Sequence, residues 1–184
     1  MSYNTDLEHK FARLMRDKTR DPMVIEGYAS LFGEIDQGGD IVQRGAYAAS
    51  LTRLAAKGQD IKMLWQHDPA QPIGVWQEVY EDDKGLYVKG RLLDNVARAQ
   101  EAAALIDAGA IDGLSIGYCT VKSTKNDKGH RLLSELELWE VSLVTFPMLP
   151  SARVASKSED RTLAGHWRAL AEVLRSAAKE MAQF

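Results

Sequence analysis

Runs in which apolar and polar residues alternate, as on half-buried strands, recur along the chain from Met23 onwards. We predict strands at 24–32, 61–66, 73–80, 85–93, 113–122 and 131–146. The third and fourth of these meet at the polar segment 81–85, which indicates a hairpin turn. Because neighbouring strands joined by turns pair in opposite directions, the pattern favours an antiparallel sheet or barrel.

Helical periodicity marks two segments between these strands. Residues 45–57 present apolar side chains on one face, and residues 96–108 are rich in alanine. Asp94 or Asn95 is the predicted N-cap of the second helix, and Gly109 its stop. The expected fold class is therefore α+β, with two helices packed on a sheet or barrel.

The most regular helical pattern lies near the C-terminus, at 161–183. Its apolar residues recur at alternating steps of four and three and form a narrow seam: Leu163, Trp167, Leu170, Leu174, Ala177 and Met181. Such a helix either packs on its own domain or docks on a partner or a second copy. We predict a polar leader at 1–21, a domain at 22–155, and a linker with this helix at 156–184.

Composition narrows the classes of function. The 184 residues suffice for one compact domain, and the net charge of −3 offers no general basic face for nucleic acid. No apolar run reaches the ~20 residues of a membrane span. The single cysteine, Cys119, fits a reducing compartment, and the four scattered histidines show no zinc spacing. We therefore expect a protein that uses no metal or cofactor and binds neither nucleic acid nor a membrane.

Residues 113–117, Gly-Leu-Ser-Ile-Gly, match the G-x-S-x-G motif that places the nucleophile of α/β-hydrolases between a strand and a helix. Here a predicted helix precedes the serine and a predicted strand follows it, so the motif does not indicate that fold. On its strand, Ser115 shares a face with the small residues Gly117 and Cys119, which would let another backbone approach closely. Ser115 is therefore either a structural strand residue or a nucleophile.

His67 follows the apolar run 61–66, and alternation places it on the face of Ile61, Met63 and Trp65. The next two residues, Asp68 and Pro69, are expected to end the strand. A histidine in this position is either a structural residue with satisfied hydrogen bonds or a general base.

Glu140 stands out among the carboxylates of the last strand. Alternation places it on a face that is otherwise largely apolar, together with Leu136, Leu138, Ser142, Val144 and Phe146. A carboxylate there needs a hydrogen-bonding or charged partner. That partner is either an arginine in a structural ion pair or the imidazole N–H of a catalytic triad.

Four segments in this order resemble the HK97-type prohead (capsid-maturation) serine proteases of tailed phages, prophages and gene transfer agents. They are Glu26–Phe32, Leu64–Asp68 with Pro72–Gly74 after it, Gly113–Tyr118, and Glu140–Val144 with Pro147. The resemblance covers roughly residues 22 to 155.

The resemblance implies a fold like that of the herpesvirus assemblin proteases, an antiparallel β-barrel ringed by helices. Carried over by position, it assigns Ser115 as nucleophile and His67 as general base. Glu140 occupies the third position, where the herpesvirus enzymes have a second histidine. Arg153, together with Gly117, is assigned to oxyanion or substrate binding.

The resemblance also implies a substrate and a place of action. The enzyme would cut the scaffolding segment from the major capsid protein, and cut itself, inside the procapsid in the cytoplasm of a bacterial host. Self-association is expected. Two non-enzymatic alternatives are an inactive capsid-assembly or scaffolding protein of the same fold and a small-molecule-binding barrel, although a protein without activity has no chemical need for Ser115, His67 and Glu140 together.

Overall fold

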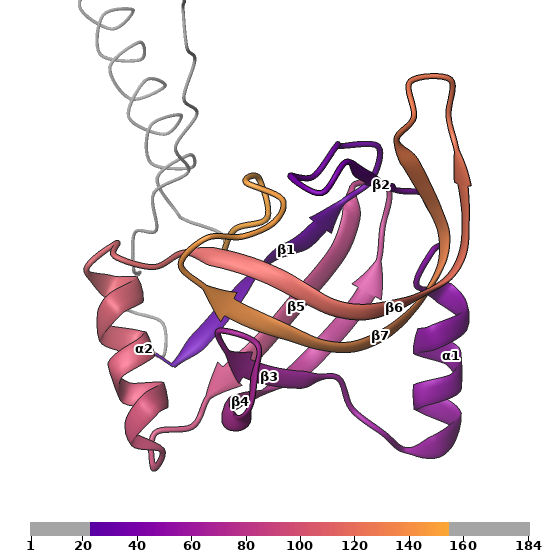
Figure 1. The fold of residues 1–184 in the computed structure, drawn as a ribbon. Coiled ribbons are helices and arrows are strands. Elements are labelled where there is room, and N and C mark those ends of the chain that lie inside the picture. Colours follow the sequence, from indigo (N-terminus) through magenta and orange to yellow (C-terminus); the bar gives the residue numbers. More distant parts are fainter. Residues whose placement is uncertain (1–22, 155–184) are drawn as a thin grey trace, which may run out of the picture.

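The computed structural model describes residues 23–154, which form a curled, seven-stranded sheet with two helices (Figure 1). The strands are β1 (Val24–Leu31), β2 (Asp40–Val42), β3 (Lys62–Trp65), β4 (Asp68–Glu81), β5 (Gly85–Leu92), β6 (Gly113–Lys125) and β7 (Arg131–Val144). The helices are α1 (Ala48–Lys57) and α2 (Ala97–Asp107). The predicted leader, 1–21, and the predicted linker and helix, 156–184, lie outside the described residues.

The strand order is β1-β5-β4-β3-β7-β2, and β6 pairs with β7 as well. Four pairs are antiparallel, but β2 and β3 both run parallel to β7. The prediction of a purely antiparallel sheet is therefore wrong at β7. The physical reason is that long connections, not tight turns, separate β2 and β3 from β7 in the chain, so no hairpin dictates their direction.

A short extended segment crosses the seam where β1 and β6 come together. Arg153 bridges Gly113 of β6, and Val154 bridges Gly27 of β1. The result is a sheet curled into a half-barrel. The predicted ring of helices is not seen in residues 23–154, where α1 and α2 flank opposite ends of the sheet (Figure 1).

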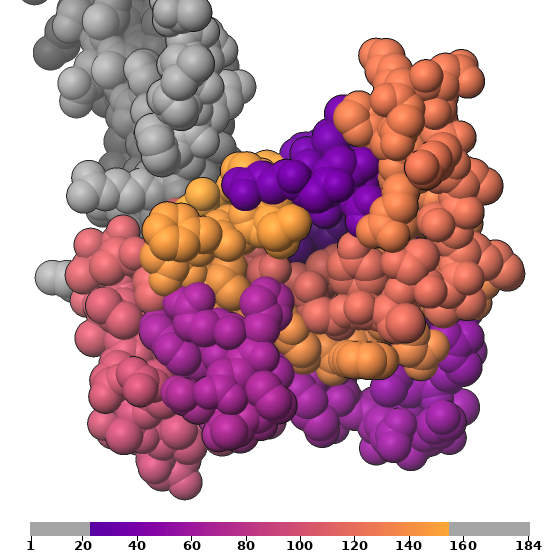
Figure 2. All heavy atoms as spheres, viewed as in Figure 1, coloured from indigo at the N-terminus to yellow at the C-terminus, as the bar shows by residue number. Residues whose placement is uncertain are grey.

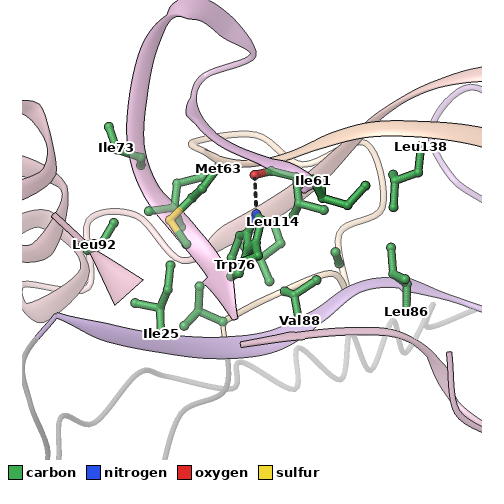
Figure 3. Packing of buried hydrophobic residues seen from close by; sticks show 14 of the residues in the cluster. Ile25, Ile61, Met63, Ile73, Trp76, Leu86, Val88, Leu92, Leu114 and Leu138 are labelled. Carbon is green, nitrogen blue, oxygen red and sulfur yellow. Dashed lines mark hydrogen bonds between the residues drawn. The ribbon is translucent and has the colours of Figure 1, made fainter. Parts of the chain in front are cut away.

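The concave side of the sheet encloses the hydrophobic core (Figure 3). Trp76 lies in it, and its indole N–H donates to the carbonyl oxygen of Val141 at 3.2 Å. Close packing here depends on small residues: a Cβ at Gly90 would lie 2.4 Å from the carbonyl oxygen of Val75 and 2.6 Å from the Met63 side chain. Leu114, Val141 and Leu143 line this side from β6 and β7 and are almost fully buried.

The helices agree with the predictions in place but not at their starts. Helix α1 begins at Ala48 instead of residue 45. The N-cap of α2 is Val96, with no side-chain capping bond, so the prediction of Asp94 or Asn95 is wrong. Gly109 ends the second helix with a left-handed φ of 70°, as predicted, because glycine adopts this region without a steric penalty.

Two strands extend further than alternation indicated, whereas β1, β3, β5 and β7 are one or two residues shorter than predicted. The strand predicted at 73–80 begins at Asp68, so Asp68 and Pro69 start a strand instead of ending one. Strand β6 continues to Lys125 into the predicted loop. Backbone hydrogen bonds to the neighbouring strands stabilise these polar ends. The pattern of side chains does not report such bonds.

Candidate active site

His67 lies in a two-residue turn between β3 and β4. Trp65 pairs with Asp68 across this turn, and both residues between them have positive φ, 53° at Gln66 and 61° at His67. The prediction that His67 continues the strand face of Ile61, Met63 and Trp65 is therefore wrong. Two left-handed residues other than glycine form a hairpin of the kind that matches the twist of its strands, at a cost of about 1–3 kcal/mol each.

Hydrogen bonds attach the strained turn to the end of β7 and to Thr145 just after it. The Gln66 N–H donates to the carbonyl oxygen of Leu143 at 2.9 Å, and the Gln66 side-chain amide donates to Thr145 Oγ1 at 2.8 Å. The His67 N–H donates to Ser142 Oγ at 3.1 Å. These contacts fix the imidazole over one face of β7.

A β-bulge sets which face of β7 carries Glu140. In the β6–β7 pairing, Gly117 lies opposite Glu140, but the next residue of β6, Tyr118, lies opposite Leu138. Trp139 is thus an extra residue that reverses the alternation. The prediction that Glu140 shares the face of Leu136 and Leu138 is wrong, because that face is the core, and after the bulge Glu140 points to the convex side.

Gly117 provides the space for the Glu140 carboxylate. A Cβ at Gly117 would lie only 2.1 Å from Glu140 Oε1 and 2.7 Å from the carboxyl carbon. The side chain of Glu140 therefore folds across the bare backbone of β6. In this structure Gly117 makes room for a carboxylate, a task that any larger residue would prevent.

Each oxygen of the Glu140 carboxylate has a partner. His67 Nδ1 lies 2.5 Å from Oε1, and the Ser142 hydroxyl donates to Oε2 at 2.6 Å. Of the two partners that the sequence left open, an arginine and an imidazole, the structure shows the imidazole. Because the carboxylate accepts, the neutral imidazole carries its proton on Nδ1, and Nε2 is left as the basic nitrogen.

Ser115 lies beside this pair on the adjacent strand. It is opposite Ser142 in the β6–β7 register, and directly opposed residues place their side chains on one face about 5 Å apart at Cβ. Ser115 is only 5% exposed. Its hydroxyl and the imidazole of His67 share no hydrogen bond within residues 23–154. Strand β6 starts before the serine and continues beyond it, and helix α2 precedes it, which confirms that the G-x-S-x-G motif is not a nucleophile elbow.

Arg153 lies beside the start of β6, where it bridges Gly113. Its guanidinium forms an ion pair with Asp112, and its Nε donates to the carbonyl oxygen of Pro150 at 2.8 Å. The Arg153 side chain is thus committed to the segment that spans the seam between β1 and β6.

A cavity of about 300 Å³ opens along the edge of β6 and is lined in part by Ser115. Two loops border it, 33–39 and 145–149, and they lie against each other in Figure 2. The N–H of Gln37 donates to the carbonyl oxygen of Met148 at 2.9 Å and joins the two loops. The cavity therefore lies next to Ser115, between β6 and these two loops.

Sequence reasoning missed Ser142 and Gln66. Ser142 is fully buried and contacts both His67 and Glu140, and Gln66 secures the turn. Alternation had placed Ser142 on the face of Glu140, and that shared face was the signal of its role in the site. No local signal marks Gln66, because its partners are distant in the chain.

No grouping of histidine, cysteine or acidic residues suited to a metal ion occurs within residues 23–154. In the same residues, neither helix is both long enough and apolar enough to pass through a membrane.

The sequence profile of the Caudovirus prohead serine protease family matches residues 10–164. Among curated proteins, the prohead protease of Enterobacteria phage HK97 is 34% identical over 141 residues, which is 74% of this chain and 61% of that protein. A capsid polyprotein of Pseudomonas phage PAJU2 is 36% identical over 113 residues, 55% of this chain and 16% of the polyprotein. The chain thus spans less than two thirds of the length of each relative.

Among solved structures, the bacteriophage T4 capsid assembly protease, gp21, superposes with a TM-score of 0.55 at 18% identity, over 67% of this chain and 82% of that one. This likeness shows a shared fold. A protease of KSHV in complex with a hexapeptide phosphonate inhibitor aligns over 72% of this chain and 63% of its own, with a TM-score of 0.49 at 10% identity.

Proposed function

The chain belongs to the family of Caudovirus prohead serine proteases, and from that premise we propose that it is a serine endopeptidase of procapsid maturation. The observation that carries this proposal is the contact of 2.5 Å between His67 Nδ1 and Glu140 Oε1, on the face of the sheet that also holds Ser115. A histidine oriented by a carboxylate and placed beside a serine is the arrangement needed for acyl transfer.

In the proposed reaction, Ser115 Oγ attacks the scissile carbonyl carbon and transfers its proton to His67 Nε2. The imidazolium then protonates the leaving amine, and water hydrolyses the acyl-enzyme with His67 again acting as base. Glu140 holds the imidazole in the tautomer with Nδ1 protonated and stabilises its cationic form. On substrate binding, rotation of the imidazole would bring Nε2 within hydrogen-bonding distance of Ser115 Oγ. Hydrogen bonds between catalytic groups are often long in the free enzyme.

We assign Arg153 to the oxyanion side of the site. The segment that contains it bonds to the start of β6, where the Leu114 N–H donates to the carbonyl oxygen of Ala152 at 2.9 Å. Because its guanidinium is paired with Asp112, Arg153 would fix the backbone around Ala152 and Leu114. This backbone would face the developing oxyanion. We also assign Gly117 to the substrate-binding side of the site. Its lack of a side chain leaves room for the Glu140 carboxylate.

The proposed substrate is the major capsid protein with its scaffolding segment, together with the protease itself. Two relatives support this: one is named a prohead protease, and the other is a capsid polyprotein of which this chain matches 16%. The site of action would be the procapsid inside the bacterial cytoplasm. Self-association would use the apolar seam of the helix predicted at 161–183, and the high local concentration in the procapsid would favour it.

A serine-reactive fluorophosphonate tests the site directly. We expect it to phosphonylate one residue of the full-length chain, Ser115, as located by peptide mapping with mass spectrometry. The Ser115→Ala variant should take up no label, whereas Ser134→Ala, which changes an exposed strand serine, should be labelled as the wild type is. Labelling at another serine would contradict the assignment of the nucleophile.

Co-expression with the major capsid protein of the same phage, prophage or gene transfer agent tests the substrate. The capsid protein should lose a defined segment in the presence of the wild-type chain and stay intact with Ser115→Ala. If both chains leave it intact while the fluorophosphonate still labels Ser115, the enzyme is a serine hydrolase with another substrate. An unreactive Ser115 and an uncut capsid protein would favour the inactive assembly protein instead.

A further inference from the structure

The cavity beside Ser115 has two kinds of wall. One part of its lining is apolar and comes from β1, β2, β6 and the loop after β7: Leu31, Val42, Leu114, Ile116, Met148 and Leu149. The other part carries four charged side chains, Glu34, Asp36, Asp40 and Arg131. A volume of about 300 Å³ is ample for one long amino-acid side chain and too small for a folded segment.

Two of the four charges cancel. Arg131 Nε donates to Asp40 Oδ1 at 2.7 Å, and its Nη2 forms an ion pair with Oδ2. The Tyr118 hydroxyl also donates to Asp40 Oδ2, at 3.3 Å. Burial, together with the charge of Asp40, raises the pKa of Tyr118 to about 12, so this phenol stays protonated and adds no charge to the cavity.

The remaining two carboxylates form no direct ion pair within residues 23–154, although Asp36 lies close enough to Arg131 to interact with its charge. Asp36 accepts backbone N–H groups from Gly38 and Asp40, each at 2.9 Å, and these bonds leave its negative charge in place. Glu34 accepts from the Ser151 hydroxyl, which is also neutral. The charged part of the lining therefore has a net negative charge, next to an apolar part. A partly enclosed space focuses such a potential and attracts a cation.

We propose that this cavity is a specificity subsite for a lysine or arginine side chain of the substrate, close to the scissile bond. The aliphatic stem would lie on Leu31, Leu114 and Met148, and the cationic head would reach the carboxylates of Glu34 and Asp36. Proximity to the scissile bond follows from the edge of β6 that does not pair with β7: there the cavity is lined by Ser115 as well as by Leu114 and Ile116 of the opposite face. This inference rests on the proposed function and adds the substrate chemistry to it.

The first experiment digests a proteome-derived peptide library with the full-length wild-type chain and aligns the cut sites by mass spectrometry. We expect one position near the cut bond to be enriched in lysine and arginine. Cleavage without a basic preference at any position would overturn the subsite and leave the protease function intact. A library left entirely uncut would overturn both, with the Ser115→Ala digest as the background.

The second experiment locates the preference. Two fluorogenic peptides of the preferred sequence are compared, with lysine or its neutral analogue norleucine at that position. The double variant Glu34→Gln, Asp36→Asn keeps both oxygen acceptors and removes both charges. We expect the ratio of kcat/KM for lysine over norleucine to fall by about tenfold or more, mainly through KM.

The matched control is Glu78→Gln, Asp60→Asn, which removes the same two charges from exposed positions away from the cavity. It should leave the ratio of the two peptides unchanged. An equal loss in the control would point to the overall charge of the protein, and an unchanged ratio in the cavity variant would overturn the assignment of Glu34 and Asp36.

Discussion

Beside the site, strands β6 and β7 have two faces that are both buried and chemically opposite. On the concave face, Leu114 lies opposite Leu143 in the core, and on the convex face Ser115 lies opposite Ser142. The neighbours Val141 and Ser142 are both fully buried. Burial alone therefore does not separate the two faces. What differs is how many specific partners each buried group requires.

The concave face needs only shape and apolar surface, since dispersion and the hydrophobic effect have no direction. The convex face holds a carboxylate whose side chain is 11% exposed, and both of its oxygens need donors. Its partners are His67 and Ser142, and its space comes from Gly117. A substitution on the concave face should lower stability, whereas one on the convex face should lower activity. The predictions below test this division.

Ser115→Ala should have the largest effect on activity. It removes one hydroxyl from a position next to small residues, so the free energy of unfolding should change by less than about 1 kcal/mol. Peptide cleavage should fall by at least about 10³-fold, as when the nucleophile of a triad is lost. The measurements are kcat/KM and a denaturant melt, with Ser134→Ala as control. Cleavage at the wild-type rate would refute the assignment.

His67→Ala should be nearly as damaging, and adding it to Ser115→Ala should cost little more. Groups that act as a unit in catalysis are strongly non-additive, so the double variant should resemble either single one. Rates of all three variants, measured on the same peptide, decide this. Losses that multiply would give His67 an independent, structural role.

Glu140→Gln keeps the shape of the side chain and removes its charge. The imidazolium would lose its stabilising partner, so kcat should fall by about 10²- to 10⁴-fold while the protein stays folded. Activity per folded molecule and the thermal midpoint are the two readouts. A lowered midpoint with unchanged activity would instead make Glu140 a structural residue.

Gly117→Ala and Gly90→Ala form a matched pair, one on each face. At Gly117 the new methyl group meets the flexible end of Glu140, so the carboxylate should leave His67 and kcat should fall by about tenfold or more with little loss of stability. At Gly90 it meets backbone and core side chains, and stability should fall by about 1–3 kcal/mol with activity per folded molecule retained. Loss of stability with retained activity for Gly117→Ala, or loss of activity with retained stability for Gly90→Ala, would contradict the assignment of activity to one face and stability to the other.

Leu136→Ala should have the smallest effect on activity. This residue is fully buried on the concave face of β7, and its truncation should lower the free energy of unfolding by about 2–5 kcal/mol. The kcat measured below the melting transition, per folded molecule, should stay within about twofold of the wild type, since Leu136 lies in the core and pairs with Thr120, away from Ser115 and Ser142. A large loss of kcat would show that the faces are coupled.

Part of the site could be predicted because its residues have unusual chemistry for their positions. Ser115 was singled out by its small neighbours, and Glu140 by the burial that its strand implied. Their proximity to His67 could not be predicted from the pattern, because it depends on β3 running parallel to β7, with Leu64 opposite Ser142. Alternation reports which face a residue occupies but not which strand lies alongside.

By itself, the sequence determined where most of the strands and both described helices lie, since hydrophobic periodicity and glycine stops are local properties. It also determined the chemistry available to the site. Only the tertiary structure decided how these groups are aimed. The bulge at Trp139 turned Glu140 to the convex face, and the left-handed turn at Gln66 and His67 placed the imidazole over it. Both features cost local energy and persist because hydrogen bonds to β6 and β7, from residues far away in the chain, stabilise them.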